Sequence, residues 1–262
     1  MTKSIVITSG KGGVGKTTVT TNLARRLAQQ NYRVLVIDAD FGLNNIDMAF
    51  GLEREVVYDL SDVLDGRCRL KQALLNDKYF ANLYVLPSEK LYLSKTVSAE
   101  SIKVAISVVA KLFDYILIDS PAGIDDGFLR AVACADSALV VVTSGAFSLR
   151  DADKVISVLK SYKLDEIGIV INRVRGDLLL SKKCFGWREV EDILKQNVVG
   201  VIPDSDFLLE ENGLPLPKRC DVSMAFNVLA KNIISNKKEV YDVTKKYRGF
   251  IGSIRRSLRG GV

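Results

Sequence analysis

One short segment limits the folds open to this chain more than any other part of its sequence. It reads Gly10-Lys11-Gly12-Gly13-Val14-Gly15-Lys16-Thr17-Thr18, directly after the apolar run at residues 5–7 and directly before a helical pattern at residues 17–29. Glycines let the backbone curl so that several N–H groups point at one anion, and the positive end of the following helix adds to the attraction. Strand, loop and helix together predict a phosphate-binding loop in an α/β protein.

Two side chains of this loop predict what it binds. In a G-x-x-x-x-G-K-[ST] loop, Lys16 reaches the β- and γ-phosphates and the Thr17 hydroxyl ligates Mg²⁺. A glycine-rich turn without a ligand is the alternative, but both the motif and its position between strand and helix favour binding. We therefore predict that residues 10–18 bind ATP together with Mg²⁺.

Short β-branched runs alternate with helical patterns along the rest of the chain. Strands are expected at residues 5–7, 34–38, 83–85, 115–119, 138–143, 168–172 and 198–202, and helices at 17–29, 100–112, 148–162 and 187–195. Continuous apolar runs are typical of strands covered on both faces, as in a mostly parallel sheet. The prediction is a doubly wound α/β domain of P-loop NTPase type over residues 1–243, followed by a basic tail over residues 244–262.

The composition excludes several other kinds of site. The 262 residues contain no histidine, which excludes histidine-based triads and most zinc sites. The four cysteines form no C-x-x-C pair, so a disulfide framework is not expected. Because we find neither a run of 18 apolar residues nor a signal-peptide pattern, a cytoplasmic protein is expected.

Carboxylates stand at the ends of two predicted strands, on the side where ligands collect in open α/β sheets. Asp119 ends the run at 115–119 and is expected to hold Mg²⁺ through the water shell of the ion. Asp38 is the last residue of the run at 34–38, and Asp40 lies two residues further along the loop that follows. We expect Asp40 to orient the attacking water, and it is a further candidate for the metal. Capping of the next helix is the alternative use of each carboxylate.

Lys11 is a second lysine in a loop that needs only one for its own phosphates. With it, the segment 11–18 resembles the signature of the deviant Walker A family, which includes MinD, ParA and related ATPases. In that family the equivalent lysine crosses a dimer interface to the phosphates of the partner. The resemblance implies a homodimer in the ATP-bound state, because bound nucleotide and dimerisation then stabilise each other. It also implies ATP hydrolysis with a slow basal rate, assisted by Lys11, Lys16, Asp40 and Asp119.

Further motifs resemble the MinD branch of this family over essentially the whole chain. Residues 37–47 and 57–59 are similar to its first switch segment and the stretch after it, and residues 119–124 are similar to its second switch. Asn44 departs from the arginine that is common in this branch. Two turns resemble those that contact adenine, which implies contacts from Asn172, Arg173, Pro203 and Asp204. Residues 149–153 resemble the helix start that serves the regulators MinC and MinE, which implies a regulator surface of Asn45, Arg150, Asp151 and Asp153.

The tail combines basic charge with an apolar stripe. Residues 245–259 include six Lys or Arg and no acid. If the tail is projected as a helix at 100° per residue, five apolar side chains fall within a stripe about 100° wide, and four arginines lie on the opposite side. The apolar set is Tyr247, Phe250, Ile251, Ile254 and Leu258, and the arginines are Arg248, Arg255, Arg256 and Arg259. This pattern is typical of a helix in an anionic membrane interface, and MinD proteins end in a similar sequence. Gly249 and Gly252 weaken the helix, so we expect it to fold only on lipid.

The tail and the function both have alternatives. The tail could pack on its own domain or on another chain, whereas nucleic-acid binding is disfavoured because phosphate contacts need no apolar stripe. The leading interpretation is a MinD-like ATPase that recruits a MinC-like inhibitor, is stimulated by a MinE-like activator and positions the division site. It would act on the cytoplasmic face of the inner membrane, or in the plastid stroma. A ParA-type partitioning ATPase, a flagellar-number regulator and a non-hydrolysing nucleotide-gated scaffold are the alternatives.

Overall fold

The computed structural model describes residues 2–40, 45–88, 98–164, 166–208 and 213–259, and the structural statements below refer to these residues. The strands are β1 (Lys3–Thr8), β2 (Val34–Asp38), β3 (Leu75–Asn76), β4 (Leu83–Leu86), β5 (Tyr115–Asp119), β6 (Ser137–Val142), β7 (Glu166–Val174) and β8 (Asn197–Pro203). The first helices are α1 (Lys16–Gln29), α2 (Ile46–Phe50), α3 (Leu60–Leu64), α4 (Leu70–Ala73), α5 (Ala99–Ala110) and α6 (Asp126–Ala133). They are followed by α7 (Ala146–Ser161), α8 (Gly176–Leu180), α9 (Trp187–Leu194), α10 (Asp221–Ser235) and α11 (Gly249–Arg259), with short 3-10 turns η1 (Asp206–Leu208) and η2 (Lys245–Tyr247).

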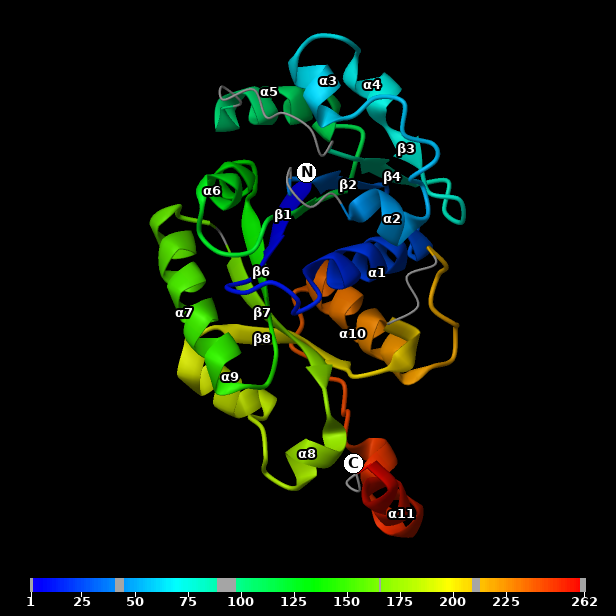
Figure 1. The fold of residues 1–262 in the computed structure, drawn as a ribbon, viewed down its shortest axis with the longest axis vertical. Helices are drawn as coiled ribbons and strands as arrows, with labels where there is room; N and C mark the ends of the chain where they lie inside the picture. Colours follow the sequence, from blue (N-terminus) through cyan, green and yellow to red (C-terminus); the bar gives the residue numbers. More distant parts are fainter. Residues whose placement is uncertain (1, 41–44, 89–97, 165, 209–212, 260–262) are drawn as a thin grey trace.

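The strands form one eight-stranded sheet in the order β3-β4-β2-β5-β1-β6-β7-β8. All neighbours are parallel except β3, which pairs antiparallel with β4 at the edge. Helices α1, α2 and α10 cover one face, and α5, α6, α7 and α9 cover the other (Figure 1). The predicted doubly wound, mostly parallel α/β fold is confirmed.

The central strands are buried on both sides, which explains their continuous apolar runs. All five residues of β5 are buried. Ile116 and Ile118 pack toward α5 and α6, whereas Leu117 packs toward α1. Because side chains alternate between the two faces of a strand, both faces need apolar residues here. Every predicted strand and helix is present, with bounds shifted by a few residues at most.

Parallel pairing brings the carboxyl ends of β1, β2 and β5 to one edge of the sheet. Asp38 and Asp119 are register partners on β2 and β5, and Ile7 pairs with Asp119 from β1. The loop predicted to bind phosphate leaves β1 at this same edge. We call it the carboxyl edge, and we call the opposite side, where these strands begin, the amino edge.

The C-terminal segment differs from its prediction in two ways. Its two glycines predict a helix that folds only on lipid, but residues 249–259 form helix α11 at the end of the molecule next to α8 (Figure 1). Tyr247 is separate from that helix and buried. It packs on the first residue of α8, since a Cβ on Gly176 would lie 2.9 Å from the Tyr247 ring. The backbone then turns at Gly249, which has a φ of +73°.

The remaining stripe residues lie on α11. Phe250 and Ile254 are 84% and 49% exposed. Arg248, just before the helix, and Arg256 on it are exposed as well. The side chains of Ile251, Arg255, Leu258 and Arg259 lie outside the described part of the structure. Within that part, no helix is both long and apolar enough to cross a membrane.

Candidate active site

The predicted phosphate loop connects β1 to α1 and is held by its own side chains. The Ser9 hydroxyl donates to the Lys11 carbonyl at 2.8 Å, which closes the first turn. Gly13 and Gly15 have φ values of +79° and +91°, a region that glycine adopts without strain. Helix α1 begins directly after Gly15, so the N–H groups of its first turn face the loop. Lys11 is exposed, and Lys16 is half-buried.

Two other elements approach this loop so closely that only glycine fits. A Cβ on Gly15 would lie 2.3 Å from Nδ2 of Asn172, at the end of β7. A Cβ on Gly10 would lie 2.4 Å from the backbone of Asp151, on α7. The ends of the loop are therefore packed against the neighbouring secondary structure, which fixes its shape before any ligand arrives.

A cavity of about 470 Å³ opens above the loop at the carboxyl edge. It brings together most of the residues predicted to bind nucleotide, which lie far apart in the sequence. They are Gly12, Gly13, Gly15, Lys16, Thr17, Thr18 and Arg173. The lining also includes Asp40, predicted to orient the attacking water, and Asn45 of the predicted regulator surface. Met48 and Ala49 of α2 complete the lining together with Pro121 and Ala122, which belong to the segment that resembles the second switch.

Asp119 lies beneath the loop and is hydrogen-bonded to α1. The Thr17 hydroxyl donates to its Oδ2 at 2.7 Å, and the Thr20 hydroxyl donates to its Oδ1 at 2.9 Å. Burial raises the pKa of Asp119 to about 6, although the Lys16 ammonium and both hydroxyls act in the opposite direction. Sequence reasoning missed Thr20, whose three-residue spacing from Thr17 on one helix face was the available signal.

The same oxygens are suited to Mg²⁺. The ion prefers carboxylate, hydroxyl and water oxygens, and Thr17 and Asp119 place two such oxygens together. Burial and the nearby Asp119 raise the pKa of Asp38 well above its usual range. Its Oδ1 accepts a hydrogen bond from the Asp40 N–H at 2.9 Å, and no described group pairs with its Oδ2. A cation here would favour the charged form of Asp38 and give its Oδ2 a partner, so the residues fit the predicted metal.

Asn172 combines a structural contact with a vacant acceptor. Its Nδ2 donates to the Val14 carbonyl of the loop at 2.8 Å. Its Oδ1 is buried and pairs with no described group. A ligand with an N–H group, such as the exocyclic amine of adenine, could supply the missing donor.

Three other predicted adenine contacts lie at the ends of β7 and β8. Arg173 has a φ of +55° and is exposed at the wall of the cavity. The Asp204 N–H donates to the Val174 carbonyl at 3.0 Å, which places Asp204 and the buried Pro203 beside the end of β7. The two turns that resemble adenine-contacting turns are thus neighbours in space.

Two residues of the predicted regulator surface, Asn45 and Asp151, lie next to the loop or its cavity. Asn45 caps α2 and is exposed at the rim of the cavity. Arg150 and Asp153 are exposed on α7, and Asp151 is half-buried with its carboxylate 3.8 Å from Lys154. Asn44, the departure from the MinD pattern, lies outside the described residues.

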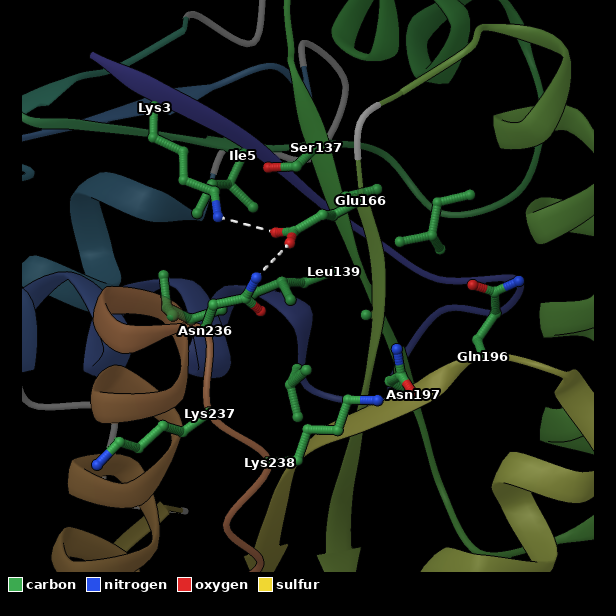
Figure 2. Close-up of a pocket in the computed structure, with 15 residues that line it drawn as sticks. Lys3, Ile5, Ser137, Leu139, Glu166, Gln196, Asn197, Asn236, Lys237 and Lys238 are labelled. Carbon is green, nitrogen blue, oxygen red and sulfur yellow. Dashed lines mark hydrogen bonds and ion pairs between the residues drawn. The ribbon is translucent and has the colours of Figure 1, made fainter. Parts of the chain in front are cut away.

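A second cavity of about 250 Å³ lies at the amino edge. Figure 2 shows Lys3 and Asn236 both directed at Glu166. Glu166 accepts from Lys3 at 3.0 Å and from Asn236 at 3.1 Å, and Lys238 donates to Asn197 at 2.7 Å. These groups satisfy each other, whereas Asp38 and Asn172 at the carboxyl edge retain unpaired oxygens. The first cavity is therefore the candidate active site.

Comparison with known proteins agrees with this assignment. A family model described as an AAA domain matches residues 2–168. A MinD-type septum site-determining protein of Emiliania huxleyi is 43% identical, and the match covers 92% of this chain and 91% of that protein. The chain belongs to the MinD family.

Solved structures of MinD proteins share the fold. The MinD chain of a MinC:MinD cell division complex from Aquifex aeolicus is 38% identical and has a TM-score of 0.83, with 90% of this chain and 97% of that chain covered. MinD of Pyrococcus horikoshii in complex with Mg-ADP is 30% identical with a TM-score of 0.77, covering 89% and 96%. The chain is accordingly a P-loop member of the MinD group of cell-division ATPases.

Proposed function

We propose that this protein is an Mg²⁺-dependent ATPase that positions the cell-division site, as a nucleotide switch that attaches to a membrane. The observation that carries the proposal is the Thr17–Asp119 pair beside Lys16, at the carboxyl edge of a chain that resembles MinD proteins over nearly its whole length. The Mg-ADP complex of the Pyrococcus relative supports the same ligand.

The residues of the site divide the work of hydrolysis. Backbone N–H groups of residues 10–18 and the Lys16 ammonium bind the phosphates and stabilise the charge that develops on the γ-phosphoryl group. A bound Mg²⁺ would be held by Thr17 and, through water, by Asp119, and it would neutralise phosphate charge. Asp40, on the cavity wall, orients the attacking water. Lys11 of the partner subunit contributes a further positive charge, which couples ATP binding to dimerisation.

Attachment to the membrane is assigned to α11. Phe250 and Ile254 are exposed apolar residues, with Arg248 and Arg256 exposed on the same segment. Burial of apolar side chains in the interface and attraction of arginines to anionic lipid both favour binding. One tail binds reversibly, and two tails on one dimer gain avidity on the order of 10²-fold. By sequence, Ile251, Leu258, Arg255 and Arg259 belong to this surface.

We assign the regulators to the rim of the active site. A MinC-like inhibitor and a MinE-like activator would bind near Asn45, Arg150, Asp151 and Asp153. Asn45 lines the cavity, and the Asp151 backbone packs against Gly10 of the phosphate loop. The Aquifex relative was solved with MinC, which supports a partner of that kind. The site of action would be the cytoplasmic face of the inner membrane, or the stromal face of a plastid membrane.

Phosphate release in the presence of Mg²⁺, ATP and anionic vesicles tests the proposal. We expect Asp40→Ala to abolish release and Lys11→Ala to abolish both ATP-dependent dimerisation and release, because each removes a group from the assembled site. Lys3→Ala, at the amino edge, is the matched lysine control and should release phosphate like the wild type. If the Lys11→Ala variant still dimerises and hydrolyses ATP, the proposal is wrong. Release no greater than that of Asp40→Ala would favour the non-hydrolysing scaffold.

A further inference from the structure

Helix α1 contains two adjacent arginines that are almost fully buried. Arg25 is 4% exposed and Arg26 is 8% exposed. A buried guanidinium is costly unless its donors are paired, so each must have a defined partner. Arg26 contacts α10, where its Nη2 donates to Ser223 Oγ at 2.7 Å. Arg25 instead contacts Phe50, at the C-terminal end of α2.

Arg25 is paired with a carboxylate that is itself fixed. Its Nε and Nη2 donate to Asp77 Oδ2 at 3.2 and 3.0 Å, and the Asp77 side chain is 0% exposed. The other oxygen, Oδ1, accepts from the N–H groups of Tyr79 and Phe80, both at 2.9 Å. Asp77 is therefore held by the turn after β3, and it holds the guanidinium in one place.

Two aromatic rings complete the surroundings of the guanidinium. Its central carbon lies 5.0 Å from the centroid of Phe50 and 5.6 Å from that of Tyr79, within cation–π range. Phe50 is the last residue of α2 and is completely buried. Arg25 thus connects the C-terminal end of α2 to α1 through a guanidinium that lies over the Phe50 ring.

The backbone at the C-terminal end of α2 is also closely packed. Nη2 of Arg25 also donates to the Gly213 carbonyl at 2.7 Å. Gly213 lies against Gly51, the residue that ends α2, since a Cβ on Gly213 would lie 2.7 Å from the Gly51 Cα. Lys78 donates to the Gly51 carbonyl from the other side. The end of α2 is held by α1, by the turn after β3 and by the segment at Gly213.

The same short helix forms one wall of the active-site cavity. Asn45, Met48 and Ala49 line it, facing Lys16 and Thr17 at the start of α1. Helix α2 has five residues, and such a short helix is not stable by itself, so its position depends on these tertiary contacts. A shift of its anchored end would move the cavity wall relative to the phosphate loop.

We propose that Arg25 is a positioning residue for nucleotide binding, which holds the α2 wall of the cavity at a fixed separation from the phosphate loop. Arg25 touches no ligand in this assignment and acts through Phe50 and Gly213. The inference rests on the proposed nucleotide site, and it adds a residue that neither the loop motif nor the switch segments contain.

Titration with a fluorescent methylanthraniloyl ADP in the presence of Mg²⁺ tests this proposal. The double variant Arg25→Met/Asp77→Asn removes the contact without leaving Asp77 buried and unpaired, and we expect its affinity to be weaker by about fivefold or more. Arg26→Met is the matched control. It also removes a buried arginine from α1, but Arg26 contacts α10 and not α2. The control should bind within about twofold of the wild type.

Thermal melting separates positioning from general destabilisation. A double variant that melts at a lower temperature but binds ADP like the wild type would overturn the proposal. A loss of ADP affinity in Arg26→Met equal to that in the double variant would overturn it as well. If the double variant does not fold, Arg25→Lys is the second test. It keeps a charge for Asp77 but loses the guanidinium over the Phe50 ring, and it should weaken binding beyond the range of about twofold allowed for the control. Unchanged affinity in Arg25→Lys would then overturn the proposal. If the wild type binds no ADP, both this inference and the proposed function fail.

Discussion

The two edges of the sheet contrast in how their polar side chains are satisfied. At the carboxyl edge, Oδ2 of Asp38 and Oδ1 of Asn172 are buried and pair with no described group. At the amino edge, Lys3, Glu166 and Asn236 bond to one another across the second cavity (Figure 2). Both edges belong to the same strands and have a cavity, so strand pairing does not cause the difference.

The contrast identifies the edge that requires a ligand. A buried polar atom without a partner lowers the stability of the folded state by about 1–3 kcal/mol, and a bound ligand that pairs with the atom can restore this stability. Exposed ion pairs such as Lys3–Glu166 contribute about 0–1 kcal/mol and require nothing further. The carboxyl edge therefore lowers the stability of the ligand-free chain and offers partners to a bound ligand. Changes there should have large effects on ligand affinity and stability, and matched changes at the amino edge should have small ones.

The largest expected effect comes from Lys16. Lys16→Ala removes the ammonium that we propose binds the β- and γ-phosphates, and we expect Mg·ATP affinity to fall by at least about 100-fold. Calorimetric titration measures the change, with Lys3→Ala as the amino-edge control that should bind like the wild type. Comparable losses of Mg·ATP affinity in both variants would contradict the proposed difference between the two edges.

The next effect concerns the shape of the loop. Gly15→Ala combines a φ of +91° with a Cβ 2.3 Å from Asn172, so we expect the free energy of unfolding to fall by about 2–3 kcal/mol. Gly12→Ala is the matched variant, because its Cβ would meet nothing within 4 Å. Urea unfolding without nucleotide compares the two. Equal stability would mean that the loop is not held as tightly as the structure indicates.

Asp119 gives a smaller effect with a defined pH dependence. Its pKa of about 6 in the folded chain lies above the usual 3.8, so the folded state binds the proton more tightly between these values. Stability of the metal-free chain is then lost as pH rises from about 4 to 6. Asp119→Asn should raise the free energy of unfolding by about 2 kcal/mol at pH 7.5 and by much less at pH 4.5. Urea titrations without Mg²⁺ at both pH values measure it, and an equal gain at the two would contradict the assignment.

The smallest effect belongs to the amino edge. Glu166→Gln removes one charge from an exposed network, so we expect a change in unfolding free energy below about 1 kcal/mol and unchanged ATP affinity. A chemical melt and a nucleotide titration on the same sample check both values. A clear loss of ATP affinity would show that the two edges are coupled.

Residues 10–18, Asp119 and the order of the elements could be predicted because each depends on local sequence. The loop motif needs only its own spacing, and buried parallel strands show as apolar runs. Helix α10 was missed, and so were the antiparallel β3 and the short helices α2, α3, α4, α6 and α8, because short or weakly periodic segments depend on tertiary packing.

The other misses depend on contacts between distant segments. Tyr247 fits an amphipathic stripe by periodicity, yet Gly176, about 70 residues earlier, offers it a place to pack. Asn172 resembles an adenine contact by motif, but its bond to Val14 and its vacant oxygen appear only in the fold. The environment of Arg25 joins four segments, and no local pattern shows it.

Co-sedimentation with anionic phosphatidylglycerol vesicles tests most directly whether the nucleotide at the carboxyl edge controls membrane attachment. The chain should pellet with Mg·ATP at least about tenfold more than with Mg·ADP, because only the dimer presents two α11 helices. A Phe250→Ala/Ile254→Ala variant should stay in the supernatant with either nucleotide. Equal pelleting with ATP and ADP, or pelleting of the variant at the wild-type level, would contradict the account.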